Sequence, residues 1–139
     1  MADLPTSIHL TVVTRERKVL EAECDEVVLP GVDGYLGILP GHTPLLAMLR
    51  IGVLTYRSAA AEQRMVLSWG FAEVLPNRVI VLAENAYLPD EIDASAADRQ
   101  RLDAERELAT IASHDADFAA VEAKLQESIA RANVAHSQR

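Results

Sequence analysis

The segment Leu88-Pro89-Asp90-Glu91 separates two parts of the chain that differ in composition. All six prolines and all six glycines lie at or before Pro89, together with all but two of the valines. Alanine becomes frequent from Ala94 onward. Because Val, Gly and Pro suit strands and turns whereas Ala suits helices, the sequence predicts an all-β part at residues 1–89 and an all-α part at residues 90–139.

Short apolar runs separated by turn residues predict the strands of the first part. The first run is Ser7–Thr14, in which Ile8, Leu10 and Val12 share one face. Further runs are predicted at residues 19–29, 52–57, 64–69, 71–75 and 78–82, with a hairpin turn at Pro76-Asn77 between the last two. Strands of this length, spaced by roughly ten residues, are typical of a β-sandwich or barrel.

Two amphipathic helices are predicted after the boundary. Asp93 or Ser95 can cap the first helix, which should end near Ala112, and Asp115 or Asp117 can cap the second. The predicted apolar stripe of the second helix consists of Phe118, Val121, Leu125, Ile129 and Ala132. A short connection between two such helices predicts an antiparallel hairpin, which should dock on another surface because isolated helices of this length are marginal.

Charge and hydropathy exclude several classes of partner. The chain has 139 residues and a net charge of -8 at pH 7, which disfavours nucleic acid and anionic membrane surfaces as partners. No run approaches the roughly 18 uninterrupted apolar residues of a membrane-spanning helix. The first residues lack the basic and apolar regions of a signal peptide, so we expect an intracellular protein.

Cys24 is the only cysteine, which excludes an intrachain disulfide and an all-cysteine metal site. Its acidic neighbours, among them Glu23 and Asp25, should raise the pKa of its thiol and make it a poor nucleophile. The sequence shows no Ser/His/Asp or Cys/His set. We therefore expect no catalytic residues, no metal and no cofactor.

The glycines at positions 31, 34 and 37 and the histidine at position 42 are the remaining candidates for chemistry. No G-x-G-x-x-G pattern or Walker sequence is present, so each glycine is interpreted as a turn or bulge residue. His42 follows Pro40-Gly41 and has no second histidine at metal-ligand spacing. We expect it to bond to the backbone or to meet a partner, and catalysis by His42 is the alternative.

Five segments together resemble the ε subunit of the bacterial F-type ATP synthase, the counterpart of the mitochondrial δ subunit. They are Ile8–Thr14, Gly34–Leu46, Ile51–Leu54, Ser68–Val74 and Val79–Ala83, and the likeness extends over nearly the whole chain. The resemblance implies an N-terminal β-sandwich of about ten strands followed by an antiparallel two-helix hairpin. The fold class is therefore α+β, with the two kinds of structure in separate segments.

The resemblance implies a non-catalytic subunit of the central stalk of a proton-translocating ATP synthase. Such a subunit binds γ and the c-ring, couples rotation to proton flow and carries no cofactor. It lies at the cytoplasmic face of the bacterial inner membrane as a peripheral component. Its hairpin either compacts on the sandwich or extends along γ toward the catalytic β and α subunits and inhibits ATP hydrolysis. A stalk subunit also needs an exposed apolar patch for γ.

The resemblance assigns a ring-facing partner segment. Its residues are Tyr35, Leu36, Gly37, Ile38, Leu39, Pro40, Gly41 and His42. Tyr35 stands where relatives often have an acidic residue, so the contact should depend less on salt. Trp69 stands where relatives commonly have glycine, which predicts a locally different surface.

The resemblance also bears on the hairpin. Some relatives bind ATP through a motif that Ile92, Asp93 and Ala97 match, but Ala96 replaces its arginine and Glu127 replaces a supporting arginine. An acid in place of a guanidinium would repel phosphate, so ATP binding is not expected. Lys124 and Arg131 are the candidates for inhibitory contacts. A free-standing β-sandwich that binds a ligand remains the alternative to the stalk subunit.

Overall fold

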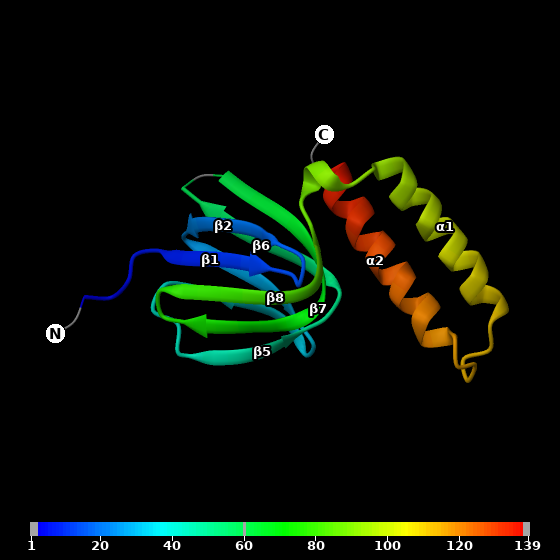
Figure 1. The fold of residues 1–139 in the computed structure, drawn as a ribbon, viewed down its shortest axis with the longest axis horizontal. Coiled ribbons are helices and arrows are strands. Elements are labelled where there is room, and N and C mark those ends of the chain that lie inside the picture. Colours follow the sequence, from blue (N-terminus) through cyan, green and yellow to red (C-terminus); the bar gives the residue numbers. More distant parts are fainter. Residues whose placement is uncertain (1–2, 60, 138–139) are drawn as a thin grey trace.

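The computed structural model describes residues 3–59 and 61–137 and contains a β-sandwich followed by a helical hairpin (Figure 1). The strands are β1 Ile8–Val13, β2 Lys18–Cys24, β3 Glu26–Gly31, β4 Gly34–Ile38, β5 Leu45–Leu49, β6 Gly52–Ser58, β7 Ala61–Leu75 and β8 Arg78–Tyr87. The predicted fold class is confirmed. The described part of the chain has eight strands rather than about ten.

Strand β7 joins the layers of the sandwich. Its first half pairs with β6, its second half pairs with β5, and β8 runs antiparallel beside it. Trp69 and Gly70, with φ values of +50° and +151°, lie at the bend. A Cβ atom on Gly70 would lie 2.1 Å from the Leu82 carbonyl oxygen, so only glycine fits there. The two runs predicted at residues 64–69 and 71–75 are therefore one bent strand.

The remaining pairings close the sandwich. Strand β1 pairs antiparallel with β2 and parallel with β8, and β3 pairs with β4, β5 and β6. The turn predicted at Pro76-Asn77 connects β7 to β8. The run predicted at residues 19–29 is two strands, which separate at Asp25.

Strands β4 and β5 were not predicted. The interpretation of three turn glycines was right only for Gly34, which begins β4 with φ +134°. Gly31 and Gly37 lie within β3 and β4 and pair with Gly34 and Val28. They therefore serve as strand residues, without the left-handed backbone that the prediction required.

Inward-facing side chains from the strands form one apolar core. Its largest fully buried side chains include Ile8, Leu10, Val12, Val27, Leu29, Ile38, Leu49, Leu54, Met65 and Leu67. Cys24 belongs to this core and is 2% exposed. Burial, followed by the charges of Glu23 and Asp25, raises the pKa of Cys24 to about 11. The predicted rise in the pKa of the thiol is present, although burial is a larger cause than the acidic neighbours.

Two antiparallel helices, α1 Ala94–Thr110 and α2 Phe118–His136, follow the short 3₁₀ helix η1 Pro89–Glu91. The Asp93 carboxylate accepts a 3.1 Å hydrogen bond from the Ala96 amide, which confirms Asp93 as the first cap. Asp117 holds the cap position of α2 without a side-chain hydrogen bond to the helix. The division of the chain into domains at residues 89 and 90 stays a prediction.

Helix α2 lies between α1 and the sandwich, where it packs on β6 and β7 (Figure 1). Val66, Ala130 and Val134 are buried at this contact. The predicted stripe was only partly right: Val121 and Ala132 are buried, whereas its other members are half-buried. The reason is that α2 has a partner on each side and uses two narrow faces. No helix within residues 3–59 and 61–137 is long and apolar enough to cross a membrane.

Candidate partner-binding surfaces

Strands β5, β7 and β8 place a row of large apolar side chains on the outside of the sandwich. Met48 lies opposite Phe71, and Phe71 lies opposite Leu82, so the three side chains are direct cross-strand neighbours. They are 58%, 48% and 55% exposed. Val13 continues the row beside Leu82, and Leu46 lies two residues from Met48 on the same face of β5. We call these five residues the apolar face.

The apolar face adjoins an open depression of about 690 Å³. The depression is lined by Val13, Thr14, Arg15, Met48, Leu49, Trp69, Gly70, Phe71, Leu82, Ala83 and Glu84. Apolar side chains with a charged rim, here Arg15 and Glu84, are typical of a surface that binds another protein. The expected exposed apolar patch is therefore present.

The apolar face was predicted as a feature but not by its residues. A signal for it exists in Leu45–Leu49, where all five residues are apolar. An antiparallel strand with one solvated face normally alternates polar and apolar residues. A short strand without this alternation is typical of a strand whose outer face does not stay in water, so the outer face of β5 is a candidate for contact with a partner.

The predicted ring-facing segment is divided between a strand and a loop. Tyr35 to Ile38 belong to β4, and only Leu39 to His42 belong to the connection that leads to β5. Ile38 is 1% exposed and faces the core, whereas Leu39 is 58% exposed. The segment therefore offers Tyr35 near the start of β4 and the turn at Leu39 beyond its end as separate surfaces.

Tyr35 is held in place by contacts with its neighbours. The guanidinium of Arg50 lies 5.1 Å from the centre of its ring, and its hydroxyl oxygen accepts a 3.4 Å hydrogen bond from the Val53 amide. Arg50 in turn donates hydrogen bonds to the carbonyls of Gly31 and Ile51. The tyrosine thus supplies ordered aromatic surface, 52% exposed, where an acidic residue would supply charge.

The turn around His42 is fixed by the backbone. Gly41 has φ +86°, and its amide donates a 2.7 Å hydrogen bond to the Pro76 carbonyl. Nδ1 of His42 lies 2.7 Å from the Thr43 carbonyl and donates to it, as predicted for a turn histidine. Among residues 3–59 and 61–137, no group of three or more His, Cys, Asp or Glu side chains is placed to hold a metal ion.

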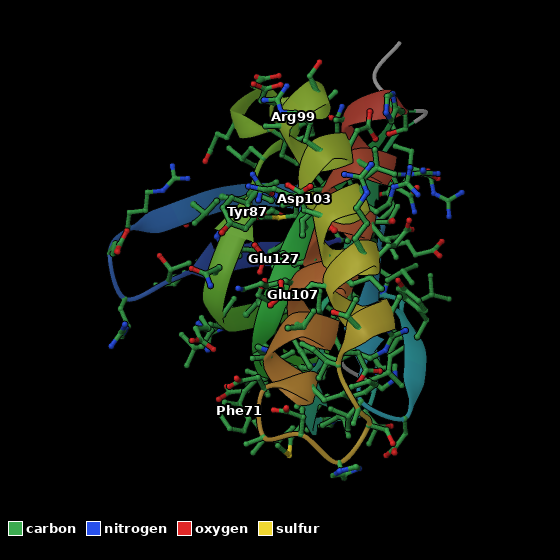
Figure 2. The ribbon with its side chains drawn as sticks, turned by 90° about the vertical axis from the view of Figure 1, so that its right-hand side faces the viewer. Phe71, Tyr87, Arg99, Asp103, Glu107 and Glu127 are labelled. Carbon is green, nitrogen blue, oxygen red and sulfur yellow. The ribbon has the colours of Figure 1, made fainter. Side chains whose placement is uncertain are left out.

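A groove of about 370 Å³ runs between α1 and α2. It is lined by Gln100, Asp103, Ala104, Glu107, Lys124, Glu127, Ser128 and Arg131. Figure 2 shows Asp103 and Glu107 of α1 near Glu127 of α2. Three carboxylates against two cations disfavour a polyphosphate in this groove.

The residues that match the ATP motif have structural roles here. Asp93 caps α1, Ala97 is buried, and Ile92 packs against the cluster that joins α2 to β7. At position 96 the backbone amide donates to the Asp93 carboxylate, and the alanine side chain offers no charge to a ligand.

Glu127 and Arg131 fasten the hairpin to the sandwich. The buried Ser68 hydroxyl, on a residue 1% exposed, donates a 3.0 Å hydrogen bond to the Glu127 carboxylate. The Arg131 guanidinium lies 4.9 Å from the ring centre of Tyr87 and donates to Gln100 at 3.0 Å. Lys124 is exposed, so of the two candidate inhibitory residues only Arg131 is engaged in the docked hairpin.

The described part of the chain thus combines a β-sandwich that has an apolar outer face with a helical hairpin docked on the sandwich. Residues 7–89 match the family described as ATP synthase, Delta/Epsilon chain, beta-sandwich domain. The chain is 43% identical over 130 residues to the ATP synthase epsilon chain of Moorella thermoacetica, covering 93% of this chain and 96% of that one. The identity to the epsilon chain of Herpetosiphon aurantiacus is 43% over 132 residues, covering 95% and 96%.

The chain belongs to the family of ATP synthase epsilon chains. Solved structures show the same fold: a chain of the Euglena gracilis mitochondrial ATP synthase, described as OSCP/F1/c-ring, matches with a TM-score of 0.79 at 22% identity. That match covers 92% of this chain and 81% of the Euglena chain. A chain of the Tetrahymena thermophila mitochondrial ATP synthase central stalk and c-ring matches with a TM-score of 0.63 at 13% identity, covering 96% and 99%.

Proposed function

We propose that this chain is a non-catalytic subunit of the central stalk of a proton-translocating F-type ATP synthase, where it couples rotation of the stalk to the c-ring. The observation that carries the proposal is the exposed row of Met48, Phe71 and Leu82 in a member of the epsilon-chain family. A rotating subunit needs a lasting interface, and lasting interfaces are more apolar than transient ones.

The γ subunit is the proposed occupant of the apolar face. Full burial of a Leu, Met or Phe side chain stabilises by about 1.5–3 kcal/mol, so covering three half-exposed side chains gives several kcal/mol before the costs of association. The c-ring is proposed to meet the turn from Leu39 to His42, with Tyr35 as a further contact. Both Leu39 and Tyr35 are more than half exposed, which suits contact with another subunit. The subunit would act at the cytoplasmic face of the bacterial inner membrane, held there by its partners.

Binding to purified γ tests the central proposal. Phe71→Ala removes the middle of the apolar face and should weaken binding roughly 30-fold, because truncating a central interface aromatic costs about 2 kcal/mol. Leu102→Ala is the matched control, since Leu102 is 43% exposed on α1, away from the apolar face. Calorimetry measures both affinities. If the unmodified protein does not bind γ at micromolar concentrations, the proposal is wrong.

The hairpin is proposed to regulate ATP hydrolysis without control by ATP. The buried apolar cluster between α2 and the sandwich consists of only Val66, Ala130 and Val134, so this contact is modest and an alternative site along γ can compete within a few kcal/mol. Lys124 and Arg131 would then face the catalytic β subunit, after Arg131 leaves Tyr87. ATP can shift this equilibrium only through a difference in affinity for the two states, and the acidic groove offers it little.

A further inference from the structure

The linker between the sandwich and the hairpin is fastened to the turn that joins β1 to β2. In that turn, Nη2 of Arg17 donates hydrogen bonds of 2.7 and 2.6 Å to the two carboxylate oxygens of Glu91. Glu91 is the last residue of η1 and lies two residues before the cap of α1. An ion pair between positions 74 residues apart in the chain thus holds the linker just before the hairpin begins.

The turn presents Arg17 from an ordered backbone. The Thr14 amide donates a 2.9 Å hydrogen bond to the Arg17 carbonyl. The Thr14 hydroxyl oxygen accepts hydrogen bonds from the amides of Glu16 and Arg17 at 3.3 and 3.4 Å. Because the backbone of this turn is already fixed, formation of the ion pair has to order only the two side chains.

Apolar packing does little to hold η1 itself. This short helix, Pro89–Glu91, has no buried residue. Leu88, which precedes it, packs against the core of the sandwich, whereas Ile92, which follows it, packs in the cluster that joins α2 to β7. The contact between Arg17 and Glu91 therefore lies between a residue that belongs to the sandwich and a residue whose packing depends on the docked hairpin.

Helix α1 connects this restraint to α2. Near the start of α1, the Asp98 carboxylate lies 3.1 Å from Nε2 of His136 at the end of α2. The Gln100 side chain accepts a 3.0 Å hydrogen bond from Arg131. These contacts tie the helices together at the end of the hairpin that lies beside η1 (Figure 1). The two helices should therefore leave the sandwich together, and their departure pulls on the linker.

We propose that Arg17 and Glu91 form a latch that favours the docked hairpin and opens when the hairpin leaves the sandwich. This inference rests on the proposed function, in which the released hairpin inhibits ATP hydrolysis. The two side chains are 48% and 34% exposed, so water screens the pair and the hairpin can break it. Exposed ion pairs shift an equilibrium by about two- to fivefold. A contact of this strength biases the position of the hairpin without locking it.

Native-state hydrogen exchange of the full-length protein tests the latch. Glu91→Gln removes the charge with little change of shape and should make the amides of α2 exchange about two- to fivefold faster, whereas those of β1 and β8 keep their protection. Arg17→Gln should have the same effect, and the double variant should exchange no faster than either single variant. Asp90→Asn is the matched control, because Asp90 is the neighbouring exposed acid of η1, and it should leave α2 unchanged.

Charge reversal separates the ion pair from other roles of the two residues. Arg17→Glu alone should release α2 further, because it sets two acids against each other, and the addition of Glu91→Arg should restore protection. Unchanged exchange in α2 after Glu91→Gln overturns the inference, as do additive effects of the two neutralisations. Faster exchange limited to residues 88–92 also overturns it, because the pair would then fasten the linker without acting on the hairpin.

The assembled enzyme distinguishes a failure of the latch from a failure of the proposed function. In a catalytic sector that contains the Glu91→Gln variant, ATP hydrolysis should fall by up to the same two- to fivefold, because more of the hairpin is released. Faster exchange in α2 without any change in hydrolysis supports the latch but refutes the proposed regulatory role of the hairpin. Unchanged exchange in α2 overturns the latch, whatever the hydrolysis rate.

Discussion

The hydrogen bond between Ser68 and Glu127 allows a sharp test of what holds the hairpin on the sandwich. Glu127→Ala removes the acceptor and leaves a hydroxyl without its partner on a residue that is 1% exposed. Hydrogen bonds to charged groups contribute about 1.5–3 kcal/mol. Because the Glu127 side chain keeps 26% of its exposure, the lower end, about 1.5 kcal/mol, is the appropriate magnitude.

A loss of this size should make the amides of α2 exchange about tenfold faster, since 1.4 kcal/mol corresponds to a factor of ten. Native-state hydrogen exchange measured by mass spectrometry resolves α2 from β1 and β8, whose amides should keep their protection. Glu122→Ala is the matched control, because Glu122 is an exposed glutamate on the same helix.

A double-mutant cycle with Ser68→Ala separates the pair from its surroundings. When the hydroxyl is already absent, removal of Glu127 should cost distinctly less, leaving a coupling energy of about 1 kcal/mol or more. Additive effects would refute the assignment of docking strength to this hydrogen bond. Equal acceleration of exchange in α2 and β8 would also refute it, since that pattern indicates global destabilisation.

Three further predictions concern coupling, regulation and pH. Replacing Tyr35 or His42 with a bulky charged residue should lower proton pumping while ATP hydrolysis persists, and unchanged pumping in inverted vesicles would contradict the ring-facing assignment. Truncation after Asp93 should leave assembly intact and raise any suppressed ATPase activity, and normal inhibition after truncation would contradict the role of the hairpin. Calorimetry of the isolated protein with millimolar ATP should show no saturable binding, and a clear binding isotherm would contradict the claim that ATP does not control the hairpin. Because burial raises the pKa of Cys24 from 9.0 to about 11, only the unfolded thiol ionises in between, and stability should fall from pH 9 to pH 11. The loss between pH 8 and pH 10.5 should be about 2 kcal/mol, as measured by urea denaturation, and it should be absent in Cys24→Ala. Equal pH dependence in both proteins would exclude the thiol as its cause.

Local signals in the sequence were enough to predict most elements. The Pro76-Asn77 turn, the Asp93 cap and the end of the β-rich part depend on neighbouring residues, and all of them appear in the structure. That β7 is one continuous strand depends on its pairing with β5, β6 and β8. Such pairing between distant segments cannot be predicted from a local sequence pattern. For the same reason Gly34–Ile38, with two glycines in five residues, was interpreted as a turn.

The buried face of α2 and the candidate binding surfaces were also predicted only in part. The stripe predicted for α2 assumed a single buried face, but α1 and the sandwich bury different residues of this helix, such as Ser128 and Val134. An exposed apolar patch followed from the expected class of protein. Its residues follow only from the register that sets Met48, Phe71 and Leu82 side by side.

The parallel pairing of β1 with β8 has a consequence for synthesis on the ribosome. The partner of His9 is Arg78, roughly 70 residues later, so at about 5–20 residues per second β1 waits some 4–14 s for that neighbour. Strand β2 can cover one edge of β1 soon after it is made, but the other edge stays open until β8 emerges. An open edge beside Leu10 and Val12 is a site for pairing with other nascent chains. Overproduction at low temperature, or together with a chaperone that binds exposed strand edges, should therefore raise the yield of correctly folded protein.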